Sequence, residues 1–101
     1  MARLIIIKKI SEKNDIHYYA VYVNESQDEI AYYMGIDQKR KKILFFSNNY
    51  FNHAVCIYDL LADKFEMQDS EIKPKIGSYV IIKAIQALQT NHFPEYISWQ
   101  S

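Results

Sequence analysis

The residues of this chain that could carry out chemistry form three groups, the first of which is His53 with Cys56. Their spacing suits the first two ligands of a zinc site, or a cysteine–histidine nucleophile pair. A structural zinc site needs four such ligands, and the two other histidines, His17 and His92, are distant in the sequence. No glycine-rich turn flanks the pair to form an oxyanion site. We interpret them as a loop histidine and a buried strand cysteine, and predict no enzyme, no metal and no cofactor.

The second group consists of carboxylates concentrated in two segments. Residues 59–71 carry five acidic residues against one lysine, and residues 14–38 carry five acidic residues and no base. Such carboxylates can supply acid–base pairs or a magnesium site, but they more often form a solvated face. They can also form an acidic patch that meets a basic partner. The residues predicted to bind a partner in that case are Asp59, Asp63, Glu66, Asp69, Glu71, Glu25 and Asp28.

The third group is the basic run at residues 39–42, which reads Lys-Arg-Lys-Lys. Basic side chains bind phosphates, and aromatic side chains on neighbouring strands can stack on bases. The aromatic residues close to this run are Tyr32, Tyr33, Phe45 and Phe46. A small module that binds single-stranded nucleic acid is therefore the alternative function. A soluble hairpin turn whose lysines protect a sheet edge also explains the run, and twelve acidic residues balance the twelve basic ones, which argues against a general nucleic-acid coat protein.

Charge is segregated along the chain although its sum is zero. The basic run at 39–42 is followed by residues 43–58, which contain no Asp, Glu, Lys or Arg, and then by the acidic segment. Sign blocks of this kind can form opposed surface patches in a protein of zero net charge.

The elements that must position these groups are mostly short strands. Runs rich in β-branched and aromatic residues alternate with polar turns over the first two thirds of the chain, which favours an antiparallel meander. We predict strands over residues 3–10, 17–23, 29–36, 42–47 and 54–58, with a short sixth at 64–68. The spacing of Val55, Tyr58, Leu61 and Phe65 also allows a helix over 55–65, although we favour strand.

Residues 77–91 form the only stretch with clear helical periodicity. One face of this helix carries Ile81, Ala84, Ile85 and Leu88. Ser78 is the expected N-cap, Asn91 suits the C-terminal end, and Pro94 prevents continuation. The apolar arc extends from Val80 to Ile82, which is too wide for a free surface helix and predicts a lid over the core. We expect the aromatic tail at 93–99 to pack back on the sheet.

Length and cysteine content set the outer limits. One hundred and one residues make one domain of ordinary size, and half of them are apolar. A single cysteine excludes an internal disulfide, which fits a reducing cytosol. The apolar run at 4–7 is too short for a signal-peptide core or a membrane span. We therefore expect one cytoplasmic α+β domain over residues 1–101, with five to six antiparallel strands and one C-terminal amphipathic helix packed on one face.

Several segments together resemble the small immunity proteins of bacterial contact-dependent inhibition and polymorphic toxin systems. They span residues 30–99 and are Tyr33-Met34-Gly35-Ile36-Asp37, Ile43-Leu44-Phe45-Phe46-Ser47, Pro74, Val80-Ile81-Ile82-Lys83-Ala84 and Phe93-Pro94-Glu95-Tyr96. The resemblance implies a cytoplasmic, non-catalytic protein that binds and blocks one cognate toxin domain, often a nuclease. Binding surfaces differ between such families, so the resemblance assigns no site residue.

The expected function is therefore an immunity-type inhibitor, and its partner a toxin domain with a basic surface. The acidic residues given above fit that partner, because opposite charge steers fast association. Nine tyrosines also suit a protein interface. A homodimer through an open sheet edge is a further expectation.

Overall fold

An antiparallel sheet with one helix against it makes up the described part of this computed structural model, which covers residues 4–23, 30–67 and 76–100. Its elements are β1 (Leu4–Lys13), β2 (Ile16–Val23), β3 (Tyr32–Asp37), β4 (Lys42–Phe46), β5 (Cys56–Asp59), β6 (Lys64–Met67), α1 (Ser78–Thr90) and β7 (Tyr96–Gln100). The predicted α+β class is confirmed. The sheet has seven strands, however, rather than the five to six predicted.

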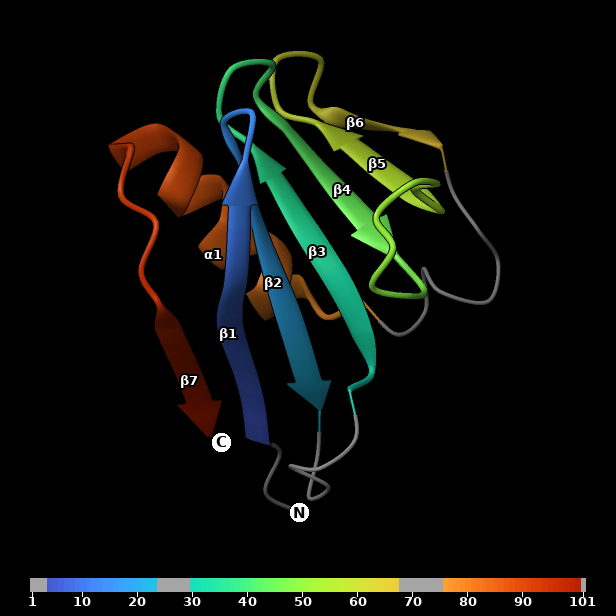
Figure 1. The fold of residues 1–101 in the computed structure, drawn as a ribbon. Helices are drawn as coiled ribbons and strands as arrows, with labels where there is room; N and C mark the ends of the chain where they lie inside the picture. Colours follow the sequence, from blue (N-terminus) through green and yellow to red (C-terminus); the bar gives the residue numbers. More distant parts are fainter. Residues whose placement is uncertain (1–3, 24–29, 68–75, 101) are drawn as a thin grey trace.

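The strand order explains the additional strand. The sheet runs β6-β5-β4-β3-β2-β1-β7, so the first six strands form the predicted meander and β7 returns to the outer side of β1 (Figure 1). The aromatic tail therefore extends the sheet at its edge, with Ile97 opposite Ile7. The Tyr19 hydroxyl holds the tail by donating to the Pro94 carbonyl at 2.9 Å. The alternative of a helix over 55–65 is wrong, because β5 and β6 form a hairpin there.

The turn between β1 and β2 is tighter than the gap between the predicted strands at 3–10 and 17–23. Asn14 and Asp15 form it alone, with positive φ angles of 55° and 64°. Two positive φ angles define the hairpin turn that matches the twist of the flanking strands, and Asn and Asp tolerate this conformation. The polar residues before it, from Ser11 to Lys13, lie in the exposed end of β1, where no apolar alternation is needed.

Helix α1 covers one face of the sheet through four buried side chains, two of which are alanines. Its buried residues are Val80, Ala84, Ala87 and Leu88. The apolar face is thus rotated from the predicted one: Ile81 and Ile85 are half-buried, and Ile82 is 51% exposed. Alanines at the contact allow the helix backbone to approach the sheet. None of the helices in the described residues is long and apolar enough to cross a membrane.

The helix ends differ from each other in how well the sequence predicts them. Gly77 is the N-cap, in an extended conformation and without a side-chain bond, so Ser78 is the first helical residue and the prediction of a Ser78 cap is wrong. Asn91 closes the other end in the left-handed conformation, with φ of 58° and its N–H directed to the Ala87 carbonyl. That is the C-cap geometry expected of Asn.

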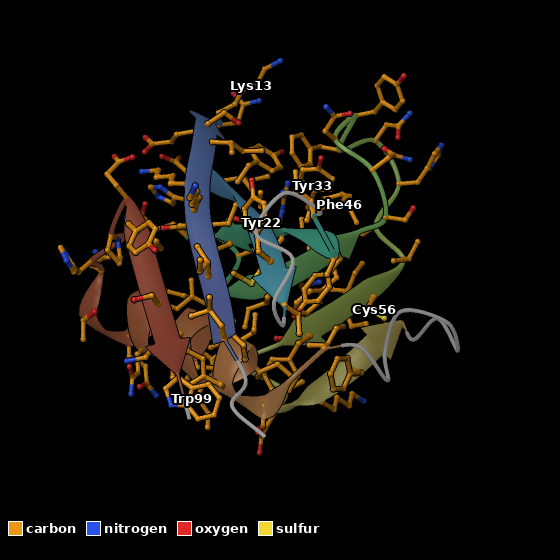
Figure 2. All side chains as sticks on the ribbon, turned by 90° about the horizontal axis from the view of Figure 1, so that it is seen from below. Lys13, Tyr22, Tyr33, Phe46, Cys56 and Trp99 are labelled. Atoms are coloured by element: carbon orange, nitrogen blue, oxygen red, sulfur yellow. The ribbon has the colours of Figure 1, made fainter. Side chains whose placement is uncertain are left out.

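The alternation of side chains along each strand produces two different faces. The face toward α1, here called the helix-covered face, carries the buried core. Its largest fully buried side chains from the strands are Tyr19, Tyr32, Phe45, Ile7, Met34, Ile43, Val21 and Cys56. The intervening residues point away from α1. Figure 2 shows Tyr33 and Phe46 of this second set close together, while Trp99 lies at the helix side.

Candidate functional site

Two surface regions contain the groups with functional potential, and the first lies at one end of the sheet. The turn that follows β3 and the turn that follows β5 are neighbours there (Figure 1). The Leu60 N–H donates to the Lys41 carbonyl at 3.0 Å, and Lys42 is the cross-strand neighbour of Asp59. The predicted basic run and the predicted acidic segment therefore come together. We call residues 37–42 with 59–66 the charged end.

Opposite charges alternate at the charged end. Asp59 lies between Lys42 and Lys64 in the cross-strand register. The Lys42 ammonium is 2.6 Å from the Glu66 carboxylate, and this hydrogen bond, with desolvation opposing it, raises the pKa of Lys42. The expectation of opposed patches is thus wrong for these two blocks, because antiparallel pairing of β4 with β5 places them side by side.

The acidic side chains at the charged end also give the β5–β6 turn its shape. Asp59 accepts the backbone N–H groups of Leu61 and Ala62 at 3.0 and 3.3 Å. Asp63 accepts a hydrogen bond from the Tyr58 hydroxyl, which raises the pKa of Tyr58. The turn held in this way leaves Leu61 81% exposed. The other four residues predicted to bind a partner, Glu25, Asp28, Asp69 and Glu71, lie outside the described residues.

Asp37 organises the basic turn, a role that the sequence analysis missed. Only 3% of Asp37 is exposed, yet its carboxylate accepts the N–H groups of Lys39 and Arg40 at 3.1 and 3.0 Å. The Arg40 guanidinium adds an ion pair at 3.3 Å. An aspartate two residues before the basic run is the signal that could have found it, because Asp side chains commonly bond to the backbone of a following turn.

The aromatic residues near the basic turn do not form a stacking surface. Tyr32 and Phe45 are completely buried on the helix-covered face, and Phe46 is 4% exposed. Only Tyr33, which is half-buried, retains an accessible part. Because single-strand binding needs open aromatic faces beside the cations, this arrangement gives the nucleic-acid alternative no support.

The second region is the face of the sheet that points away from α1, where the loop between β4 and β5 packs. The Phe51 ring stacks on Tyr18 at 4.3 Å between centroids and meets Phe46 and Tyr33 edge-on at 5.3 and 5.7 Å. We call these four rings the loop cluster and this side the loop-covered face. Gly35 in β3 makes room for them, because a Cβ there would lie 3.2–3.3 Å from side chains that include Tyr18 and Phe46.

The loop that carries Phe51 has an unusual backbone conformation. Phe51 has φ of 57°, in the left-handed region that bulky residues avoid. Such a conformation costs about 1–2 kcal/mol and persists only where the surroundings determine it. The ring contacts of the loop cluster are those surroundings. The preceding residue, Tyr50, is 78% exposed, and its N–H donates to the Asn48 side chain at 3.0 Å.

The loop cluster was not predicted from the sequence, which indicates only a loop with two aromatic residues at 48–53. Two signals were present. Gly35 stands inside a strand, which often marks close approach of another segment. Tyr50 and Phe51 also lie in a stretch without Asp, Glu, Lys or Arg, so neither ring has a charged neighbour in the sequence to pack against. The positive φ at Phe51 had no signal, since phenylalanine is a poor residue for that conformation.

The buried residue His17 contacts residues from β1, from the turn after β3 and from the segment after α1. His17 is 6% exposed and stacks on Phe93 with 3.8 Å between ring centroids. Its Nε2 is 3.1 Å from Gln38 Oε1, and the Gln38 amide donates to the Asn91 side chain beyond α1. Its Nδ1 lies 3.0 Å from Glu12 Oε1 without an aligned hydrogen bond. These contacts connect β1, β2 and the helix end, which indicates a structural role.

His53 and Cys56 occupy different environments, as interpreted from the sequence. His53 is exposed, whereas Cys56 is fully buried on the helix-covered face. Within residues 4–23, 30–67 and 76–100, no group of three or more His, Cys, Asp or Glu is placed to hold a metal ion.

Comparisons of this chain with protein-family models, with curated proteins and with solved structures gave no match.

Proposed function

We propose that this chain is a non-catalytic inhibitor of the immunity type, which binds one bacterial toxin domain and blocks it by occlusion. The observation that carries the proposal concerns Leu61 and Tyr50, which are 81% and 78% exposed and are the most exposed large hydrophobic side chains of the described residues. Both flank β5: Tyr50 lies in the loop before it, and Leu61 in the turn after it. Apolar and aromatic side chains form the buried centre of protein interfaces.

One partner can reach both side chains. β5 has four residues, which extend over about 13 Å. A typical interface buries roughly 800 Å² on each partner, enough to cover the strand and both of its connections. The side chains that would surround this centre are those of the charged end, and polar rims of this kind set orientation and partner choice.

The class of partner comes from the resemblance to immunity proteins. A toxin nuclease with a basic surface would meet Asp59, Asp63 and Glu66, three of the acidic residues predicted to bind. Since Lys42 and Lys64 alternate with them, these carboxylates would act through individual contacts rather than through a long-range field. Reversal of Asp63, Glu66 and Asp69 to Lys is expected to weaken binding. Unchanged affinity in that variant would exclude a contribution from the acidic residues.

The most direct test uses the protein encoded immediately upstream of this chain's gene. If the upstream product is toxic when expressed alone, coexpression of this chain should restore growth. The two purified proteins should then elute together in size-exclusion chromatography. The Val80→Asp variant, which is expected to unfold, is the matched negative control for rescue. A harmless upstream product that forms no complex would contradict the proposal.

A further inference from the structure

The loop between β4 and β5 combines three properties: it lacks charge, it packs on the sheet through the Phe51 ring, and it exposes a tyrosine. Residues 43–58 contain no Asp, Glu, Lys or Arg. The exposed residues of the loop are Ser47, Asn48, Asn49, Tyr50, Asn52 and His53. The turn between β3 and β4 differs, since three of its four residues, Lys39, Arg40 and Lys41, are charged.

The packing of Phe51 on the sheet fixes the conformation of the loop. Phe51 inserts between Tyr18, Tyr33 and Phe46 and forces the left-handed backbone next to Tyr50. At the end of the loop, the Val55 N–H donates to the Phe45 carbonyl at 2.8 Å. A surface that is fixed before binding loses less conformational entropy on association. Strained backbone that is maintained by specific packing is characteristic of binding sites.

The exposed composition suits protein recognition. Tyrosine supplies a large, amphipathic contact area with only two side-chain torsions to order, while Ser and Asn supply adaptable hydrogen bonds. We propose that residues 47–53 are the recognition element for the partner, with Tyr50 inserted as an anchor into an apolar pocket on an uncharged part of that protein's surface. This inference rests on the proposed inhibitory function and names the element that performs it.

The uncharged character of the loop has a measurable consequence. Contacts made by the charged end weaken as salt screens them, whereas the contribution of Tyr50 comes from burial and neutral hydrogen bonds. The loss of affinity caused by removing Tyr50 should therefore be the same at low and at high salt. A central anchor contributes at least about 2 kcal/mol, so the affinity should fall about 30-fold, mainly through faster dissociation.

The experiment measures binding of the upstream gene's product to the full chain by surface plasmon resonance. Tyr50→Ala is compared with Tyr96→Ala, a matched control, because Tyr96 is also exposed (54%) but lies in β7 at the opposite edge of the sheet. Phe51→Ala keeps Tyr50 but removes the packing that fixes the loop. We expect affinity to fall about 30-fold for Tyr50→Ala at either salt concentration, to fall less for Phe51→Ala, and to stay unchanged for Tyr96→Ala.

Four other results of this binding experiment would contradict the proposal. Wild-type affinity in Tyr50→Ala overturns the recognition element while the inhibitory function stands. Equal losses in Tyr50→Ala and Tyr96→Ala also overturn it, because the loop would then have no special role. A loss in Tyr50→Ala that disappears at high salt contradicts the uncharged contact. Failure of the wild-type chain to bind the upstream product overturns the proposed function and this inference with it.

Discussion

The helix-covered face and the loop-covered face of the same sheet are closed by different means. On the first, thirteen helical residues lie over completely buried strand side chains, and the contact is made by small residues such as Ala84 and Ala87. On the second, one loop covers part of the sheet through a single inserted ring, Phe51, whose backbone is strained. The helix closes its face without any residue of positive φ between Ser78 and Thr90. A loop closes less of the surface, but it leaves its own exposed residues free to bind.

The largest expected effect comes from disrupting the helix-covered face. Val80→Asp places a carboxylate at a fully buried position without a partner, which should destabilise the fold by about 3 kcal/mol or more. Thermal unfolding followed by circular dichroism should show a large loss of stability or no transition. Ile82→Asp is the control on the same helix, two residues away but 51% exposed, and should change the unfolding free energy by less than about 0.5 kcal/mol. Equal effects of the two substitutions would show that the helix is oriented differently.

Disruption of the loop-covered face should have an intermediate effect. Phe51→Ala removes the ring and should cost about 1–3 kcal/mol, while the protein stays folded because the helix-covered core is unchanged. Phe51→Gly removes the same ring but also relieves the strain, since glycine adopts positive φ freely. It should be about 1 kcal/mol more stable than Phe51→Ala in urea denaturation. If the alanine variant is as stable as the glycine variant, Phe51 does not hold the left-handed conformation.

These two faces also separate what can be predicted from sequence from what cannot. The periodicity of residues 78–91 predicts a buried helix, because residues three or four positions apart share one helix face. The alternating runs predict the strands, because residues two positions apart share one face of a sheet. The tail of β7 was predicted to pack on the sheet, but its pairing with β1 depends on contacts such as Tyr19 with Pro94, which are 75 positions apart.

The candidate site is less predictable for the same reason. The acidic and basic segments are separate in the sequence. Only the fold shows that Lys42 lies opposite Asp59 and that the Lys42 ammonium pairs with the Glu66 carboxylate. The left-handed conformation of Phe51 opposes the local preference of phenylalanine and follows from its packing on Tyr18, a residue 33 positions earlier in the chain. Local propensity cannot indicate a conformation that distant contacts impose.

The charged end should contribute less to stability than either face. The Lys42–Glu66 pair is partly exposed, with 29% and 35% of the two side chains accessible, so solvent screens it. Glu66→Gln should lower the unfolding free energy slightly at low salt and have no effect at high salt. Urea denaturation at the two salt concentrations measures the difference. A large, salt-independent loss would mean that the pair supports the β5–β6 hairpin as a core contact does.

The smallest expected effect concerns acid at the far end of the sheet. A hydrogen bond from Lys9, followed by the charge of His17, lowers the pKa of Glu12 below its usual value of 4.5. A carboxyl whose folded-state pKa is lowered stabilises the protein above its unfolded pKa, and this contribution is lost as the pH falls through the folded-state value. Stability should therefore decline slightly below about pH 4.5, and less steeply in Glu12→Gln. Identical acid profiles for the two proteins would remove Glu12 from this account.

The central claim is that the loop before β5 and the turn after it bind the partner, while the helix-covered face only supports the sheet. Hydrogen exchange of the backbone amides, measured on the free chain and on its complex with the upstream gene's product, tests it most directly. The account predicts slower exchange in the complex at residues 47–53 and 60–63, with no change along α1. Slower exchange confined to α1 and β7, with the loop unchanged, would contradict it.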